Sequence, residues 1–175
     1  MSLRLGLDIG GTKTAALVVD ETGMSLGRAT QPTDIASPER LVVGTLEIID
    51  RALYDARRGR AELVAAGVDV PGQVDPSTGS VRMSVNLNLR ESYPLGQVLQ
   101  DALGIPVALE NDVRAAAWGA YHWARRRSSR NSLAYLSIGT GIAAGLVLDG
   151  RIWRGANGMA GEIGHIPMDA VGPRC

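Results

Sequence analysis

The sequence contains the same glycine-rich pattern twice. The first copy is residues 7–20, LDIGGTKTAALVVD, and the second is residues 136–149, LSIGTGIAAGLVLD. Seven of the fourteen aligned positions are identical. Each copy predicts an apolar strand, a turn of small residues and a second apolar strand. Backbone N–H groups in such a turn can approach an anion closely, so two turns could hold a polyphosphate from both sides. The duplication therefore indicates a nucleotide-dependent enzyme.

Composition excludes several other classes of protein. The formal net charge is zero, which gives no global field for nucleic acid or an anionic membrane. The arginine-rich run 125–130 has no interleaved aromatic residues, which favours a solvated loop over a nucleic-acid patch. No stretch approaches the ~20 apolar residues of a membrane span, and a single cysteine excludes an intrachain disulfide. We therefore expect a cytoplasmic protein without a membrane partner.

The hydrophobic pattern of the first 112 residues predicts alternating strands and helices. The run 63–70 is almost continuously apolar, as in a strand covered on both faces. Residues 73–89 contain the turn pairs Asp75-Pro76 and Thr78-Gly79 and predict an irregular stretch. Further strands are expected over 3–9, 14–20, 24–29 and 106–109, and helices over 38–56 and 94–103.

The second part of the chain predicts a helix over 113–123, the second hairpin over 133–149 and an irregular glycine-rich segment over 153–168. The second copy begins at Leu136, so that it and everything after it make up only 40 residues. We therefore expect two α/β domains, residues 1–112 and 113–175, of which the first is complete and the second is shortened.

Asp8 and Lys13 flank the first glycine turn. A carboxylate at the end of a strand could hold Mg²⁺ beside phosphates, and the alternative is an exposed Asp that starts a turn. Lys13 is the only lysine of the chain, and its place in the turn suggests a phosphate contact, although a solvated hairpin tip would look the same.

Asp112 follows a predicted strand and precedes a predicted helix. Ligands bind at such strand ends in parallel α/β sheets. Phosphoryl transfer to an alcohol needs an acceptor for the hydroxyl proton, and an ionised Asp is such an acceptor. The alternative is that Asn111 or Asp112 only caps the helix.

Three further residues could take part in binding. Glu162 and His165 form a Glu-x-x-His pair that could bind sugar hydroxyls, or the imidazole could bind a metal; the alternative is a structural loop histidine. Cys175 could be the first thiolate of a metal site or a free thiol. His122, between Tyr121 and Trp123, is expected to be structural.

Five segments together resemble the ROK family of bacterial sugar kinases and sugar-responsive repressors. The resemblance extends over essentially the whole chain, and five motifs in the same order are specific. The segments are Leu7–Thr14, GVDVPGQVD at 67–75, Glu110-Asn111-Asp112 with Ala115–Gly119, Ile138–Ile142, and Gly161-Glu162-Ile163-Gly164-His165.

The resemblance implies an actin-like, hexokinase-type (ribonuclease H-like) fold and an ATP-dependent kinase for a hexose such as glucose. Asp112 would be the general base for the sugar 6-hydroxyl, and His165 would bind Zn²⁺ with Cys175 and two more cysteines. Dimers or tetramers are also implied. The implied ATP and Mg²⁺ contacts are Asp8, Gly10, Gly11, Thr12, Lys13, Gly139, Thr140 and Gly141, and the implied sugar contacts are Pro71, Gly72, Asn111, Asp112, Glu162 and His165.

Two alternatives to a kinase stay open. The chain could belong to a sugar-binding sensor that turns over no ATP, or it could be a fragment that is inactive by itself. The chain also departs from the family pattern at Ala143 and Ala144, where glycines are usual, and at Arg114, where small or amide residues are usual. Further departures are Ala120 and Glu91-Ser92-Tyr93. These departures bear on the identity of the sugar more than on the reaction type.

Overall fold

The computed structural model describes residues 2–139, 141–169 and 172. The chain divides into two compact units, Met1–Asp112 and Val113–Cys175, which are described separately below. Among the described residues, no helix is both long and apolar enough to cross a membrane.

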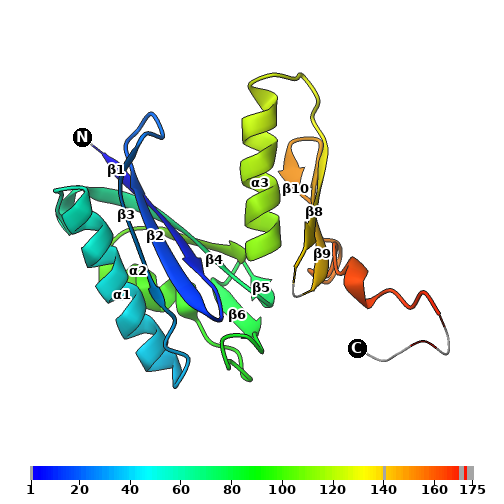
Figure 1. The fold of residues 1–175 in the computed structure, drawn as a ribbon, viewed down its shortest axis with the longest axis horizontal. Coiled ribbons are helices and arrows are strands. Elements are labelled where there is room, and N and C mark those ends of the chain that lie inside the picture. The colour runs from blue at the N-terminus through cyan, green and yellow to red at the C-terminus, as the bar shows by residue number, and fades with distance from the viewer. Residues whose placement is uncertain (1, 140, 170–171, 173–175) are drawn as a thin grey trace. The chain divides into compact units, whose positions relative to one another are not determined.

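The first unit contains a five-stranded mixed sheet in the order β3-β2-β1-β4-β7 (Figure 1). β1 pairs antiparallel with β2 and parallel with β4, and β4 pairs parallel with β7. The carboxyl ends of β1, β4 and β7 therefore lie at one edge of the sheet. The strands are β1 (Leu3–Ile9), β2 (Lys13–Val19), β3 (Ser25–Pro32), β4 (Leu63–Val70) and β7 (Val107–Asn111).

Two helices cover the buried face of this sheet. The residues at one end of each helix explain why it starts or stops there. α1 (Pro38–Asp55) starts after Ser37, whose hydroxyl accepts a hydrogen bond of 3.3 Å from the Arg40 N–H. α2 (Leu95–Leu103) ends at Gly104, which has a left-handed φ of 68°. A short 3₁₀ helix, Arg60–Glu62, precedes β4. Figure 1 shows α1 running alongside the sheet. The helices and alternate strand residues form one aliphatic core.

The expectation that both faces of 63–70 are covered is wrong. In β4 the side chains of Val68 and Val70 are buried, whereas Val64 is 44% exposed. β1 shows the same alternation of buried and exposed positions. The reason is that the helices of this unit cover one face of the sheet only. The other face is therefore available for polar side chains near the strand ends.

The expectation of an irregular segment over 73–89 is also wrong. β5 (Gln73–Asp75) and β6 (Ser80–Met83) form an antiparallel hairpin. Val74 and Val81 are buried and attach it to the core. Each strand is so short that its alternation of buried and exposed residues could not be recognised beside the turn residues that separate the two strands.

The second unit consists of one helix against a three-stranded antiparallel sheet in the order β10-β9-β8. Its small core contains Ala117, Tyr121 and Val147. A side chain at Gly145 would meet the Ala117 Cβ at 2.5 Å, so this glycine allows helix and sheet to approach. The elements are α3 (Asp112–Arg125), β8 (Leu133–Ile138), β9 (Ile142–Leu148), β10 (Arg151–Ile152) and the 3₁₀ helix η2 (Ile163–His165).

Candidate functional site

Acidic side chains occupy matching positions at the carboxyl edge of the first sheet. Asp8 on β1 is the direct register partner of Asp69 on β4, and Asp69 is the partner of Glu110 on β7. Directly opposed residues of neighbouring strands point to the same face of a sheet. The three carboxyl groups therefore share the face opposite the buried Leu7 and Ile9.

Asp69 was assigned no role from the sequence, although it lies in the GVDVPGQVD segment. Burial, the negative charges of Asp8 and Asp112, and a hydrogen bond with Asp8 together raise the pKa of Asp69 to about 7. The raised pKa shows that the carboxyl groups of Asp8 and Asp112 lie near that of Asp69. The available signal was a single acidic residue within an otherwise apolar strand, two residues before Pro71-Gly72.

Asn111 connects the predicted sugar segment to the predicted base. Its side-chain amide donates hydrogen bonds to the Gly72 carbonyl at 3.2 Å and to Asp112 Oδ1 at 2.9 Å. Asn111 is only 8% exposed. Gly72 has a φ of 105°, and a Cβ there would collide with the Met83 carbonyl. The structure thus brings Gly72, Asn111 and Asp112 together, with Pro71 directly before Gly72.

The helix-end alternative for Asp112 agrees with the same geometry. Asp112 is the first residue of α3 and the acidic residue of its first turn. A carboxylate at that position is stabilised by the helix dipole. The same placement leaves the carboxylate at the sheet edge, so both roles are compatible.

The first glycine turn is held by its own hairpin and by Thr33. The Gly10 N–H donates to the Lys13 carbonyl at 3.0 Å. The Thr33 N–H donates to the Thr12 carbonyl at 3.1 Å, and the Thr33 hydroxyl donates to the Gly10 carbonyl at 2.6 Å. These hydrogen bonds hold the turn in one conformation, which a rigid anion site requires.

Gly11 is required by packing against a neighbouring loop. A Cβ at Gly11 would lie 2.7 Å from the Asn86 carbonyl. The absence of a side chain therefore serves close packing within the unit. The side chains of Asp8 and Lys13, on either side of this turn, are exposed. Because the Gly10 N–H is used by the hairpin, the N–H groups of Gly11 and Thr12 are the candidates for an anion contact.

The glycines of the second turn are less closely packed than Gly11 of the first turn. The Gly139 N–H donates to the Gly141 carbonyl at 2.9 Å, while a Cβ at either glycine would meet no atom of the described residues within 4 Å. Thr140, a predicted phosphate contact, lies outside the described residues. Ala143 and Ala144 are partly buried in β9, and the Ala144 N–H donates to the Gly161 carbonyl at 2.7 Å. The second turn is thereby linked to the glycine-rich loop.

Glu162 and His165 lie side by side in that loop. Glu162 Oε2 is 3.9 Å from His165 Nε2, and the two side chains are 37% and 72% exposed. Among residues 2–139, 141–169 and 172, no group of three or more His, Cys, Asp or Glu side chains is placed to hold a metal ion. Cys175, the second predicted zinc ligand, lies outside this part of the chain.

His122 lies in an aromatic cluster on α3. Its ring meets Trp118 edge-on with 4.3 Å between centroids, and the Tyr121 ring is 5.4 Å away. These contacts agree with the expected structural role.

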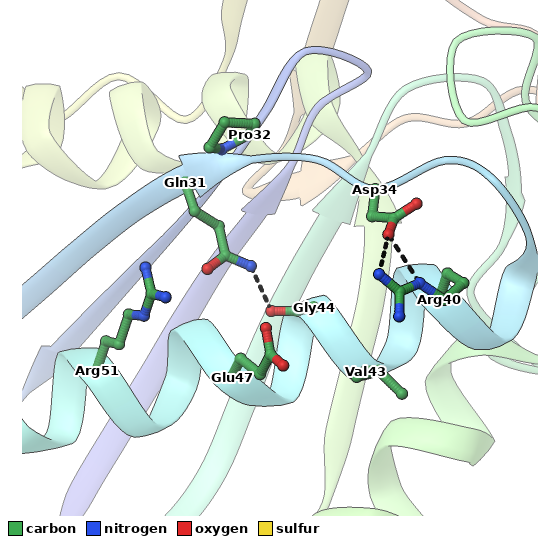
Figure 2. A pocket seen from close by; sticks show the side chains of 8 residues that line it. All are labelled: Gln31, Pro32, Asp34, Arg40, Val43, Gly44, Glu47 and Arg51. Carbon is green, nitrogen blue, oxygen red and sulfur yellow. Dashed lines mark hydrogen bonds and ion pairs between the residues drawn. The ribbon is translucent and has the colours of Figure 1, made fainter.

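A separate pocket of about 260 Å³ lies between β3 and α1. Figure 2 shows that Asp34 and Arg40 form an ion pair at its rim, with 2.8 Å between Arg40 Nη2 and Asp34 Oδ2. None of the predicted site residues lines this pocket, so it is not the site inferred from the sequence. Its lining residues are Gln31, Pro32, Asp34, Arg40, Val43, Gly44, Glu47 and Arg51.

Comparison with known proteins supports the resemblance found in the sequence. The ROK family matches residues 4–175. A glucokinase of Streptomyces coelicolor is 38% identical over 175 residues, which are all of this chain and 53% of that protein. The chain thus spans about half the length of the curated relatives it matches.

Solved structures show the same relationship. The ROK family glucokinase from Streptomyces griseus, in complex with glucose and AMPPNP, matches with a TM-score of 0.81 and 32% identity over 96% of this chain and 51% of that one. A ROK family transcriptional regulator, a homologue of the E. coli MLC protein, matches with a TM-score of 0.83 and 26% identity over 99% of this chain and 43% of that one. The predicted family and fold class are confirmed: the chain belongs to the ROK family and has the mixed α/β, actin-like fold of its hexokinases and glucokinases.

Proposed function

We propose that this chain carries the catalytic carboxylate of an ATP-dependent sugar kinase that phosphorylates the 6-hydroxyl of a hexose such as glucose. The observation that carries the proposal is the fixed position of Asp112. Asn111 donates to its carboxylate at 2.9 Å and is itself tied to the Gly72 carbonyl. A general base must be held within reach of the proton that it accepts, and this arrangement holds it.

In the proposed reaction Asp112 accepts the proton of the sugar hydroxyl. The hydroxyl oxygen forms a bond to the γ-phosphorus of ATP. The bond between that phosphorus and the bridging oxygen breaks, and ADP leaves with the electron pair. In the first unit we assign sugar contacts to Pro71, Gly72 and Asn111, and in the second unit we assign them to Glu162 and His165. Little covalent help is required, because positioning and charge neutralisation supply most of the catalysis.

We assign ATP binding to the two glycine turns. In the first turn Gly11 and Thr12 offer backbone N–H groups, and Lys13 offers an exposed cation. In the second turn Gly139 and Gly141 are the assigned contacts, and added Cβ atoms there would meet no atom within 4 Å in the part of the chain that the structure describes. Thr140 completes the second assigned set, and Gly10 belongs to the first set as the residue whose N–H bond to Lys13 holds the turn.

The described residues offer a ligand for Mg²⁺ but no complete set of ligands for Zn²⁺. Mg²⁺ needs only one or two protein carboxylates in addition to substrate phosphates, and the exposed Asp8 carboxylate at the end of β1 is such a donor. When bound, Mg²⁺ neutralises phosphate charge. Structural zinc needs four protein ligands, and the described residues provide no group of even three. Zinc therefore has no part in the proposal. Dimers or tetramers and a cytoplasmic location stay predictions.

A regulatory role is the second candidate, because a ROK transcriptional regulator matches 99% of this chain with a TM-score of 0.83. A protein with that role would bind the sugar at the same loop without transferring phosphate.

A coupled ADP-release assay across a hexose panel distinguishes the two. It is run on this chain and on a chimera that continues it with the remaining part of the Streptomyces coelicolor glucokinase. We expect hexose-dependent ADP release from the chimera with glucose or a close relative. Calorimetric sugar binding without ADP release would favour the regulator, and absence of both would overturn the proposal.

A further inference from the structure

A buried arginine on α3 contacts the glycine-rich loop of the second unit. Arg114 is 3% exposed and is the third residue of α3. Its Nη2 atom donates a hydrogen bond to the Gly158 carbonyl and lies 3.5 Å from the Ala160 carbonyl. Burial of a cation is costly unless hydrogen bonds replace its water. The loop carbonyls supply part of that replacement, at Nη2, and the buried guanidinium in turn holds these carbonyls in place.

The loop has little regular structure of its own to hold these carbonyls. Gly158 and Gly161 adopt φ values of 71° and 99°, which other residues rarely reach. On the side of β9, the Ala144 N–H donates to the Gly161 carbonyl at 2.7 Å. The loop is therefore fixed at two points, by Arg114 through Gly158 and Ala160 and by β9 through Gly161.

The two fixed points immediately precede the predicted sugar ligands. Glu162 follows Gly161 in the chain, and the Glu162 and His165 side chains come within 3.9 Å of each other. A shift of the carbonyls at 158–161 would move Glu162 directly. Both carbonyls are contacted by the same nitrogen, Nη2, which the long and permanently charged arginine side chain brings to them from a buried position.

The geometry points to Arg114 as a positioning residue that sets the sugar selectivity of the proposed kinase by fixing the loop that carries Glu162 and His165. The role of Arg114 in sugar selectivity rests on the proposed function, whereas the fixing of the loop by Arg114 does not. Arg114 acts through the loop backbone and not through contact with the sugar.

Amide hydrogen exchange on this chain tests the fixing of the loop. Arg114→Met should raise exchange at residues 155–165 by about tenfold or more, because a hydrogen bond to a charged group is lost, and Arg114→Lys should raise it less. Arg126→Met, on an exposed arginine just beyond α3, is the matched control and should leave exchange unchanged. Unchanged loop exchange in Arg114→Met, or an equal rise in β8 and β9, would overturn the inference. If Arg114→Met does not fold, Arg114→Lys decides by the same criteria.

Kinetics on the chimera test the selectivity. We expect Arg114→Met to lower the ratio of kcat/KM for the preferred hexose to kcat/KM for a second hexose of the panel about tenfold, with the KM for ATP changed less than about threefold, and Arg114→Lys to restore part of the loss. An equal loss of kcat/KM for both hexoses would overturn the selectivity role. If the unaltered chimera phosphorylates no hexose, the proposed function fails and the selectivity role fails with it, while the exchange result still decides whether Arg114 fixes the loop.

Discussion

The two hairpins share their sequence pattern but not their register. In the first hairpin Ile9 pairs with Thr14. An offset of 129 residues would pair Ile138 with Ala143, whereas the structure pairs Ile138 with Ile142. The second turn is therefore one residue shorter than the first.

This difference in register changes which side chains are buried. Leu7 and Ile9 are 2% and 0% exposed, whereas the aligned Leu136 and Ile138 are 55% and 72% exposed. The second strands of both hairpins keep the same buried positions, for example Val18 and Val147. A shift of one residue turns a strand over relative to its partner. Equal sequence patterns therefore do not guarantee equal environments.

The largest expected effect concerns these aligned isoleucines. Ile9→Ala should lower the free energy of unfolding by about 2–5 kcal/mol, since it leaves a cavity in the core, whereas Ile138→Ala should change it by less than about 0.5 kcal/mol. Urea unfolding followed by circular dichroism measures both. Equal losses would show that the two strands are equally buried.

The acidic side chains at the carboxyl edge of the first sheet predict that stability depends on pH. We expect no such effect from the second hairpin. Because the pKa of Asp69 is raised to about 7 in the folded state, its contribution to stability is full below about pH 4 and is lost as the pH rises through 7. Asp69→Asn should therefore stabilise the chain by on the order of 2 kcal/mol at pH 8 and by little at pH 4. Urea midpoints at both pH values, with EDTA present, measure this. The same gain at both values would contradict it.

The two glycine turns should differ in their tolerance of a methyl group. Gly11→Ala should cost about 1–2 kcal/mol, because its Cβ would lie 2.7 Å from the Asn86 carbonyl. Gly139→Ala should cost less than about 0.5 kcal/mol, since no atom of the described residues lies within 4 Å of the added Cβ. Thermal unfolding of the two variants compares them directly, and a larger loss for Gly139→Ala would refute the distinction.

The smallest effect concerns the aligned residues Asp20 and Asp149. Hydrogen bonds from Thr22, from its hydroxyl at 2.6 Å and its N–H at 2.8 Å, and from the Met24 N–H at 3.0 Å lower the pKa of Asp20. Its contribution to stability is present above the unfolded value and is lost as the pH falls. Asp20→Asn should thus destabilise the chain slightly at pH 7 and not at pH 3, and Asp149→Asn, at an exposed position, is the comparison. A pH series of melting temperatures tests this, and equal pH profiles would contradict it.

Features with local signals could be predicted from the sequence. Ser37-Pro38 starts α1 and Gly104 ends α2 because capping depends on neighbouring residues only. Asp112 was predicted to follow a strand and precede a helix, and the structure places it there.

Features that depend on distant partners could not be predicted. The role of Asp69 depends on its register with Asp8, which is 61 positions away. The burial of Arg114 depends on carbonyls 44 and 46 positions further on. A sequence pattern predicts whether a side chain is buried or exposed, but it does not identify the polar or charged group that the side chain meets.

The most direct measurement is the single-turnover rate of phosphate transfer in the chimera with Asp112→Asn, beside Asp101→Asn on the exposed surface of α2 as the control. We predict that Asp112→Asn slows transfer by about 10²–10⁴-fold while the sugar still binds, and that Asp101→Asn leaves the rate unchanged. A rate in Asp112→Asn within about threefold of the unaltered chimera would contradict the assignment of Asp112 as the proton acceptor.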